Sequence, residues 1–377
     1  MLKRGVLLIG FLSTFSLSLA QHHEAAAETK PATETKVVSA EEAEKEQIKK
    51  ENKEFIDHHL LDAHSFDIMV EKKADGTEHH IGFPLPVIFY DEANGLHAFM
   101  SSEFHHGKEM KDAHGKKYNV VESKGANYAL YHEKIVKTDA SGAITLDDHG
   151  HATNAKVLDL SITKSVLMIL CASLLMIVIF GSMARNYKKS PIPTGAGKLF
   201  EPLVIFIRDE IAIPNIGPKY HKYISYLLTI FFFILFLNVF GLLPFGINVT
   251  GNLAITAALA IFTFIITQFT ANRNYWQHIF WMPGLPFLMK LVMIPIELIG
   301  MIIKPFALLI RLFANMSAGH IVIMSLIAMI YYFQNVIAGV AFPFLTFVLY
   351  LLEILVAFLQ AYIFTMLSAV YFGMANE

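Results

Sequence analysis

The stretch LPFLMKLVMIPIELIGMIIKPFALLIRLFANMSAGHIVIMSLIAMIYY, residues 285–332, decides what kind of protein this is. It is compatible with a helix over its whole length. At about 1.5 Å per residue such a helix would be about 70 Å long, more than twice the roughly 30 Å core of a bilayer. The stretch must therefore break into two membrane spans or cross the membrane as one steeply tilted helix. Its charged residues are Lys290, Glu297, Lys304 and Arg311.

These four charges are spaced by seven residues, so successive members drift by only about 20° and all four share one helix face. Small residues lie within about 60° of Arg311 on the same face; they are Gly300, Ala307, Ala314 and Ala318. Small residues let a second membrane helix approach closely, and a charge inside a membrane needs a partner or an aqueous path. Two interpretations follow: a separate partner helix passes against Arg311, or the four charges form an ion-pair network within this chain.

A final apolar segment, Phe342–Gly373, is predicted to return antiparallel to the first, with turn signals at residues 334–335 and at Gly339. Residues at equal depth in such a hairpin have position numbers with a constant sum. This rule puts Arg311 level with Gln360, and residue 320 level with residue 353, and both pairs centre the turn near residue 336. The last two helices are thus predicted to form a long tilted hairpin with two polar levels.

The second polar level holds His320 and Glu353, and it is predicted to lie nearer the outer surface, because His320 is about 13 Å beyond Arg311 along the helix. A histidine and a carboxylate at one depth can exchange a proton near neutral pH, which would make an outward-facing proton path. The alternative is a static hydrogen-bonded pair that locks the hairpin. Glu297, about 20 Å from Arg311 in the other direction, is a candidate for a separate inward path. Arg311 stays charged and would stop protons passing directly between the two paths.

Three shorter apolar segments precede the hairpin and are long enough to cross a bilayer: Ser165–Met183, Tyr223–Leu243 and Leu253–Ala271. Leu199–Ala212 is amphipathic and is predicted to lie in the membrane interface. Cationic residues after the first and third segments place those ends in the cytoplasm. We therefore expect about five transmembrane helices plus one interfacial helix, with a cytoplasmic C-terminus.

The polar N-terminal part has a different composition. Residues 1–160 carry 18 Lys/Arg and 26 Asp/Glu, a net charge of −8, whereas residues 161–377 carry 12 and 6, a net charge of +6; the two add to the chain's −2. With 54% hydrophobic residues overall, a single soluble globular domain is excluded. Residues 1–20 have the pattern of a cleaved signal peptide, with Lys3 and Arg4 before an apolar stretch and small residues up to Ala20; a first membrane helix is the alternative.

Residues 21–160 are predicted to be an extracytoplasmic extension. From Phe55 to Lys156, short apolar runs alternate with turn signals, which indicates a small, partly β domain. Fourteen of the 17 histidines lie in residues 1–160. Their spacings match no metal motif, so no metal site is predicted. The alternative is that some of them bind zinc or nickel: His58–His59, His79–His80, His105–His106, His149 and His151. The lone cysteine, Cys171, excludes a disulfide framework.

Residues 160–377 resemble subunit a of the membrane sector of F-type ATP synthases. Four elements carry the resemblance: Asn238–Pro244, Pro295–Leu298, Lys304–Gly319 and Leu359–Met366. Among them, the Arg-Leu-Phe-x-Asn-Met-x-Ala-Gly element that begins at Arg311 is specific. The resemblance implies an all-α membrane domain over residues 161–377.

The resemblance also implies roles for individual residues. Arg311 would be the essential arginine that faces the rotating c ring, with Asn315 beside it and Gln360 as its hydrogen-bonding neighbour. Glu297 would lie on the cytoplasmic half-channel.

The outer half-channel would include His320 and Glu353. Some family members carry an acid after the Ala-Gly and a histidine in the last helix, so this chain has the pair exchanged. Some also carry an acid before Leu-Leu-Pro, where this chain has Gly241. Weaker candidates for the proton path are Asn238, Asn248, Asn252 and Lys304.

The function that the resemblance implies is proton translocation in the bacterial inner membrane, through two half-channels that serve the c ring and couple proton flow to ATP synthesis. The expected partners are the c-ring subunits, the b subunits of the peripheral stalk, the rest of the ATP synthase complex and the lipid bilayer, with no nucleic acid. No cofactor is expected, and no G-x-x-x-x-G-K-[ST] loop occurs, so ATP chemistry must lie on partner chains. The rival interpretations are a self-contained proton-coupled transporter and a membrane-anchored metal-binding protein.

Overall fold

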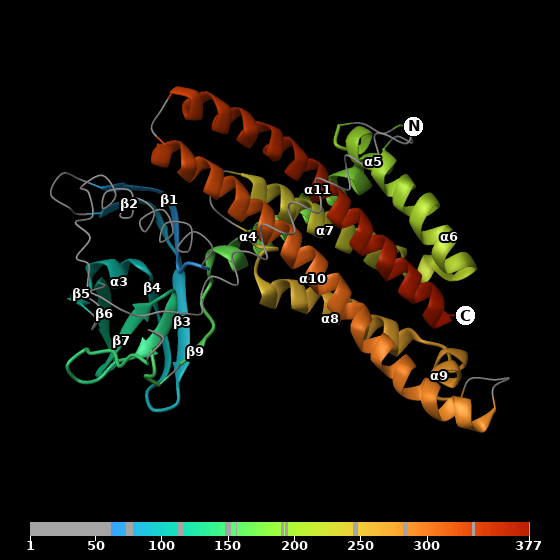
Figure 1. The fold of residues 1–377 in the computed structure, drawn as a ribbon, viewed down its shortest axis with the longest axis horizontal. Coiled ribbons are helices and arrows are strands. Elements are labelled where there is room, and N and C mark those ends of the chain that lie inside the picture. Colours follow the sequence, from blue (N-terminus) through green and yellow to red (C-terminus); the bar gives the residue numbers. More distant parts are fainter. Residues whose placement is uncertain are drawn as a thin grey trace, which may run out of the picture. The chain divides into compact units, whose positions relative to one another are not determined.

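The computed structural model describes residues 62–376, except residues 73–77, 112–116, 148–151, 156, 190–191, 193–194, 244–247, 282–285 and 334–335. The predicted signal peptide lies outside the described residues. Strands come first along the chain and helices follow (Figure 1). Five of the described helices are long and apolar enough to cross a membrane, so the coarse prediction of a mostly helical membrane protein with N-terminal strands is confirmed.

The strand-rich part forms three antiparallel sheets with the orders β1-β2, β4-β3-β9 and β5-β6-β7-β8. Its elements are β1 (Ser65–Lys72), β2 (Glu78–Pro84), β3 (Pro86–Asp91), β4 (Gly95–Met100), α3 (Ser102–His106), β5 (Lys108–Lys111), β6 (Lys117–Ser123), β7 (Ala126–Tyr131), β8 (Lys134–Lys137) and β9 (Leu158–Asp159). One core cluster joins two of the sheets through Val87, Phe89 and Tyr128, which are fully buried. The turn after β3 ends at Gly95, whose φ of 75° suits glycine.

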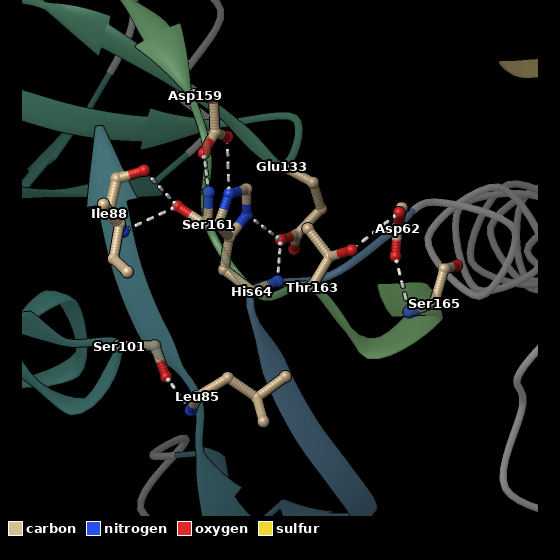
Figure 2. Close-up of polar contacts among 10 residues, drawn as sticks. All are labelled: Asp62, His64, Leu85, Ile88, Ser101, Glu133, Asp159, Ser161, Thr163 and Ser165. Atoms are coloured by element: carbon tan, nitrogen blue, oxygen red, sulfur yellow. Dashed lines mark hydrogen bonds and ion pairs between the residues drawn. The ribbon is translucent and has the colours of Figure 1, made fainter. Parts of the chain in front are cut away.

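Residues 62–64, just before β1, connect the strand-rich part to the start of the first membrane helix (Figure 2). The ring Nε2 of His64 lies 2.8 Å from Asp159 Oδ2, and its backbone N–H donates to Glu133 Oε2 at 3.2 Å. Next to it, Asp62 accepts hydrogen bonds from the Thr163 hydroxyl at 2.9 Å and the Ser165 backbone N–H at 3.1 Å. Thus the segment before β1 and the start of the first membrane helix share one polar network.

The charge of His64 should make this network pH-dependent. Burial lowers the pKa of His64, but the hydrogen bond to Asp159 and the carboxylate of Glu133, 3.6 Å from Nδ1, outweigh burial and raise the pKa from 6.5 to about 9. Because folding raises the pKa of His64, the protonated ring stabilises the fold. This stabilisation is complete below pH 6.5 and is lost as the pH rises through about 9. Burial raises the pKa of Asp159, yet its hydrogen bonds to His64 and Ser161 lower it overall, so its contribution is lost as the pH falls below about 4.

We therefore expect amide-exchange protection in β3 and β9 of the full-length protein in lipid to decline between pH 6.5 and 9.5, after correction for intrinsic exchange rates. The change in free energy should be at most about 3 kcal/mol. His64→Gln should lower protection at pH 6 and have little effect at pH 9.5. An equal effect of this substitution at both pH values would show that His64 contributes by packing rather than by its charge.

The described residues of the helical part form five long helices, a group of short helices between the first two of them, and one further short helix, α9 (Arg273–Phe280). The elements of this part are α4 (Lys164–Tyr187), α5 (Gly197–Phe206), the π-helix η1 (Ile207–Ala212), α6 (Ile213–Ile216), the 3-10 helix η2 (Gly217–Lys222), α7 (Ile224–Leu242), α8 (Leu253–Thr270), α9, α10 (Phe287–Phe333) and α11 (Val336–Asn376). The predicted amphipathic helix over residues 199–212 corresponds to α5 and η1.

Helix α7 lies at the centre of the helical core. Half of the residues in its apolar 18-residue stretch are buried, compared with 6–22% in the corresponding stretches of the other four long helices. It packs against α4 and α11, and its fully buried residues include Leu227, Phe231 and Leu237. Aromatic rings fill the space beside it, with the Phe232 ring 4.7 Å from that of Phe180. The low exposure of α7 means that its residues mainly position the other helices.

Helix α10 is one helix of 47 residues, in spite of Pro295 and Pro305, so the predicted alternative of a break into two spans is not seen. Helix α11 follows with 41 residues and packs along α10 (Figure 1). The interpretation of Gly339 as a turn residue is wrong, because it lies inside α11, where a long apolar segment continues the helix through it. The short helix α9 was not predicted.

Candidate functional site

Helix α10 has two contrasting faces around Arg311. Leu308, Leu312 and Met316, spaced by four residues, are 2%, 1% and 4% exposed and pack into the helical core. Arg311 itself is exposed. Its exposed neighbours on the same side are Ala314, Asn315 and Ala318. This exposed strip, residues 311, 314, 315 and 318, is the Arg311 face, and no described segment of the chain covers it.

No ion pair or hydrogen bond holds Arg311 within the described residues, and none joins it to the other three charges of the stripe. Lys290 lies 4.3 Å from the ring centroid of Trp281, and Lys304 Nζ lies 3.9 Å from Met374 Sδ. Glu297 is partly exposed. The interpretation of the stripe as an internal ion-pair network is therefore not what the structure shows.

Glu353 and Gln360 lie on one buried face of α11, as the spacing of seven predicts, and are 9% and 4% exposed. The small residues Ala357 and Ala361 share this face. Gln360 makes no hydrogen bond to Arg311 in the described structure, contrary to what the resemblance implied. The reason is orientation: Gln360 packs into the core, whereas Arg311 projects from the exposed side of α10.

Glu353 lies at the depth of His320, as the hairpin arithmetic predicted. Its carboxylate packs against Gly319, where a Cβ atom would overlap Glu353 Oε1. Glycine therefore lets the two helices approach closely at this level. His320 is half-buried, and no hydrogen bond or ion pair joins it to Glu353 within the described part of the chain. The static hydrogen-bonded pair is thus not seen.

Asparagines connect the other helices to this level. Asn238 is fully buried; its Nδ2 donates to the Ala357 carbonyl at 3.1 Å, and its Oδ1 accepts from the Thr250 hydroxyl at 2.9 Å. Asn248 Nδ2 donates to the Met316 carbonyl at 3.2 Å. Asn252 accepts from the Ala254 N–H at 2.9 Å and caps α8. All three make structural hydrogen bonds that position α8, α10 and α11.

Lys304 lines a cavity between α8, α9, α10 and α11 that was not predicted from the sequence. The polar residues around it are Thr263, Thr267, Gln268, Tyr275, Lys304 and Tyr371. Gln268 Nε2 donates to the Tyr275 hydroxyl at 3.4 Å, while its buried Oε1 has no hydrogen-bond partner in the described structure. A sequence signal was available, because Thr256, Thr263 and Thr267 recur at seven and four residues along one face of α8.

No cluster of three or more His, Cys, Asp or Glu side chains that could hold a metal ion occurs among the described residues. His58 and His59 of the predicted alternative metal site lie outside those residues. His79 and His80 are in β2, and His105 and His106 are in α3.

Comparison with known proteins identifies two regions. Residues 166–373, just over half of the chain, match the family model of the ATP synthase A chain. The chain belongs to the ATP synthase A chain family. Residues 55–160 match a domain of unknown function (DUF8433).

Several relatives with curated names match the chain. The chain is 48% identical over 228 residues to "ATP synthase subunit a 2" of Chlorobaculum tepidum, covering 58% of this chain and 64% of that protein, slightly under two thirds. It is 49% identical to "ATP synthase subunit a" of Chloroherpeton thalassium, covering 58% and 67%. With the protein of that name from Chlorobium phaeobacteroides BS1 the identity is 39% over 314 residues, covering 78% and 90%. Family membership and the five long helices make the chain a multi-pass membrane protein.

Proposed function

We propose that this chain is the proton-translocating subunit of an F-type ATP synthase membrane sector, providing two half-channels to a rotating c ring. The observation that carries the proposal is the Arg311 face: a permanent charge on a membrane helix, beside small residues, that the chain itself leaves open. The relatives' names support it. They do not favour the self-contained transporter.

The outer path of the proposal uses the level of His320 and Glu353. Both are at least half-buried, and both can carry a proton. Protons would enter there and pass to a ring carboxylate beside Arg311. Gln360 and Asn315 flank this route. Asn238 and Asn248 serve to hold its walls.

The inner path of the proposal includes Glu297 and the cavity lined by Lys304. Replacing Glu297 by Gln removes the ionisable group with little change in size, so we expect a several-fold lower rate of ATP-driven proton pumping in vesicles with normal complex assembly. Glu122→Gln, at an exposed strand position, is the matched control. Unchanged pumping with Glu297→Gln would remove Glu297 from the exit path.

We place the chain in the bacterial inner membrane, with a signal peptide at residues 1–20, a periplasmic extension at 21–160 and the membrane domain at 161–377. Contacts at the ends of the helices are consistent with alternating crossings. The end of α11 meets the start of α7, where Asn376 Nδ2 donates to the Tyr223 hydroxyl at 2.6 Å. It also meets the end of α8, where Asn272 N–H donates to the Ala375 carbonyl at 2.7 Å. These ends would be cytoplasmic.

The partners of the proposal are the c ring at the Arg311 face, the b subunits of the peripheral stalk, and the rest of the complex, which performs the ATP chemistry. Ala318→Cys, in a chain with Cys171→Ser, should form a disulfide with a cysteine introduced into the membrane helix of a c subunit, under mild oxidation of membranes that hold the whole complex. Ala357→Cys, at a site 1% exposed on α11, is the matched control and should give no crosslink to a c subunit. The proposed contact would be contradicted if Ala318→Cys gave no crosslink to any position in a cysteine scan of the c helix while the complex still pumped protons.

A further inference from the structure

The sheet β4-β3-β9 has one face that is buried and another that is exposed and apolar. On the buried face of β3, Val87 and Phe89 are fully buried. Residues of the opposite face alternate with them along the strands. Antiparallel sheets normally cover one face with the core and present polar side chains on the other. The outer face of this sheet departs from that rule.

The residues of this outer face, all exposed except the partly buried Ile88, form adjacent cross-strand rows. Tyr90 pairs with Leu96 on one side and with Leu158 on the other. In the next row Ile88 lies beside Leu160, whose N–H donates to the Ile88 carbonyl at 2.8 Å. Directly paired residues point to the same face of an antiparallel sheet. We call this set, completed by Met100, the apolar sheet face; its members Leu96, Leu158 and Leu160 are 54%, 61% and 57% exposed.

The apolar sheet face continues into the membrane span. Leu160 is four residues before Lys164, where α4 begins. The apolar surface resumes at once on α4, where Leu170 is 52% and Leu174 is 63% exposed. Helix α4 has 24 residues and would be about 36 Å long, longer than a hydrocarbon core of about 30 Å. Its first turn would therefore reach the lipid headgroups, and the covalently attached sheet would lie at their level.

We infer that the apolar sheet face rests on the outer leaflet of the lipid bilayer, with the side chains of β3, β4 and β9 inserted among the headgroups and upper acyl chains. Contiguous apolar surface of this kind marks an interaction site. Tyr90 suits the interface, since tyrosine has an apolar ring with a polar end and is enriched there. The inference does not depend on the proposed proton path, because it uses only the sheet, its exposure and its connection to α4.

Spin labels test the inference in the full-length chain with Cys171→Ser, reconstituted in phosphatidylcholine–phosphatidylglycerol nanodiscs. Labels at Leu96→Cys and Leu158→Cys should be relaxed more by oxygen, which partitions into lipid, than by water-soluble nickel–EDDA. Glu122→Cys and Lys134→Cys, exposed on the sheet β5-β6-β7-β8, are the controls. Their labels should be relaxed more by nickel–EDDA than by oxygen. The oxygen-to-nickel ratio should differ severalfold between the two pairs.

Two results would overturn the inference. Labels at positions 96 and 158 that are as accessible to nickel–EDDA as the controls would place the face in water. Labels shielded from both reagents would mean that protein covers the face, either the N-terminal segment before β1 or a second copy of the chain. As a second measurement, Tyr90→Trp in a background with Trp276→Phe and Trp281→Phe should be quenched by brominated phosphatidylcholine, whereas Lys134→Trp should not.

Discussion

Arg311→Ala should reduce ATP-driven proton pumping to near zero while leaving the fold intact. The side chain is exposed and has no ion pair or hydrogen bond within the described structure, and exposed substitutions of this kind change stability by about 0.5 kcal/mol or less. The loss would come from the missing charge. A guanidinium stays ionised at any accessible pH, so it can separate two proton paths and attract a passing carboxylate.

The measurement is quenching of a pH-sensitive dye in inverted vesicles that contain the whole complex, with subunit content checked by immunoblot. Passive proton leak should be measured in the same vesicles, since loss of the barrier can raise it. Arg311→Lys keeps a charge but loses the planar five-donor group, and should recover little pumping. Normal pumping by Arg311→Ala would show that the charged stripe of α10 is structural and that the proposed mechanism is wrong.

Glu353→Gln should lower proton pumping without lowering the stability of the complex. Glu353 is 9% exposed and has no hydrogen bond or ion pair in the described structure, so its carboxyl group is costly to bury in charged form. Glutamine has the same shape and no charge. We therefore expect pumping to fall by about tenfold or more, as for loss of a proton-transferring group, while the thermal stability of the purified complex is unchanged or higher.

Glu353→Asp is the informative companion, because it keeps the carboxyl group and should retain part of the activity. A structural role would give the other pattern, with stability and pumping falling together in both variants. If Glu353→Gln pumps normally, the outer path does not use this residue. Gly319→Ala then offers an independent probe of the same level, since its Cβ would collide with Glu353.

The fold could be predicted in outline because long apolar runs in a membrane protein have few structural options. The bounds of α4, α7 and α8 differ from the predicted spans by at most a few residues. The length of residues 285–332 left a choice between one tilted helix and two spans, and only packing against α8 and α11 could decide it. Gly339 was misinterpreted for a similar reason, since glycine is common inside membrane helices.

The site could be predicted only where periodicity determines it. Spacing along one helix placed Glu353 and Gln360 on one face, and hairpin arithmetic put Glu353 level with His320. Spacing could not say which way each face turns, and in the described structure Gln360 faces the core while Arg311 is exposed. The cavity beside Lys304 is formed where four helices pack together. The residue pattern of a single segment cannot predict how separate helices pack.

The contacts that hold the C-terminal half of α11 have a mechanical consequence. At one end Asn376 is fixed to the start of α7, and Lys219 Nζ donates to its carbonyl at 3.2 Å. Towards the other end, the Tyr350 hydroxyl donates to the Leu242 carbonyl, and Asn238 holds Ala357. Helix α11 is thus held by α7 and its flanking residues at its C-terminal end and again at residues 350–357. Sideways force from the proposed turning partner on the Arg311 face would be passed through this half of α11 into α7, which would keep the two helices in place.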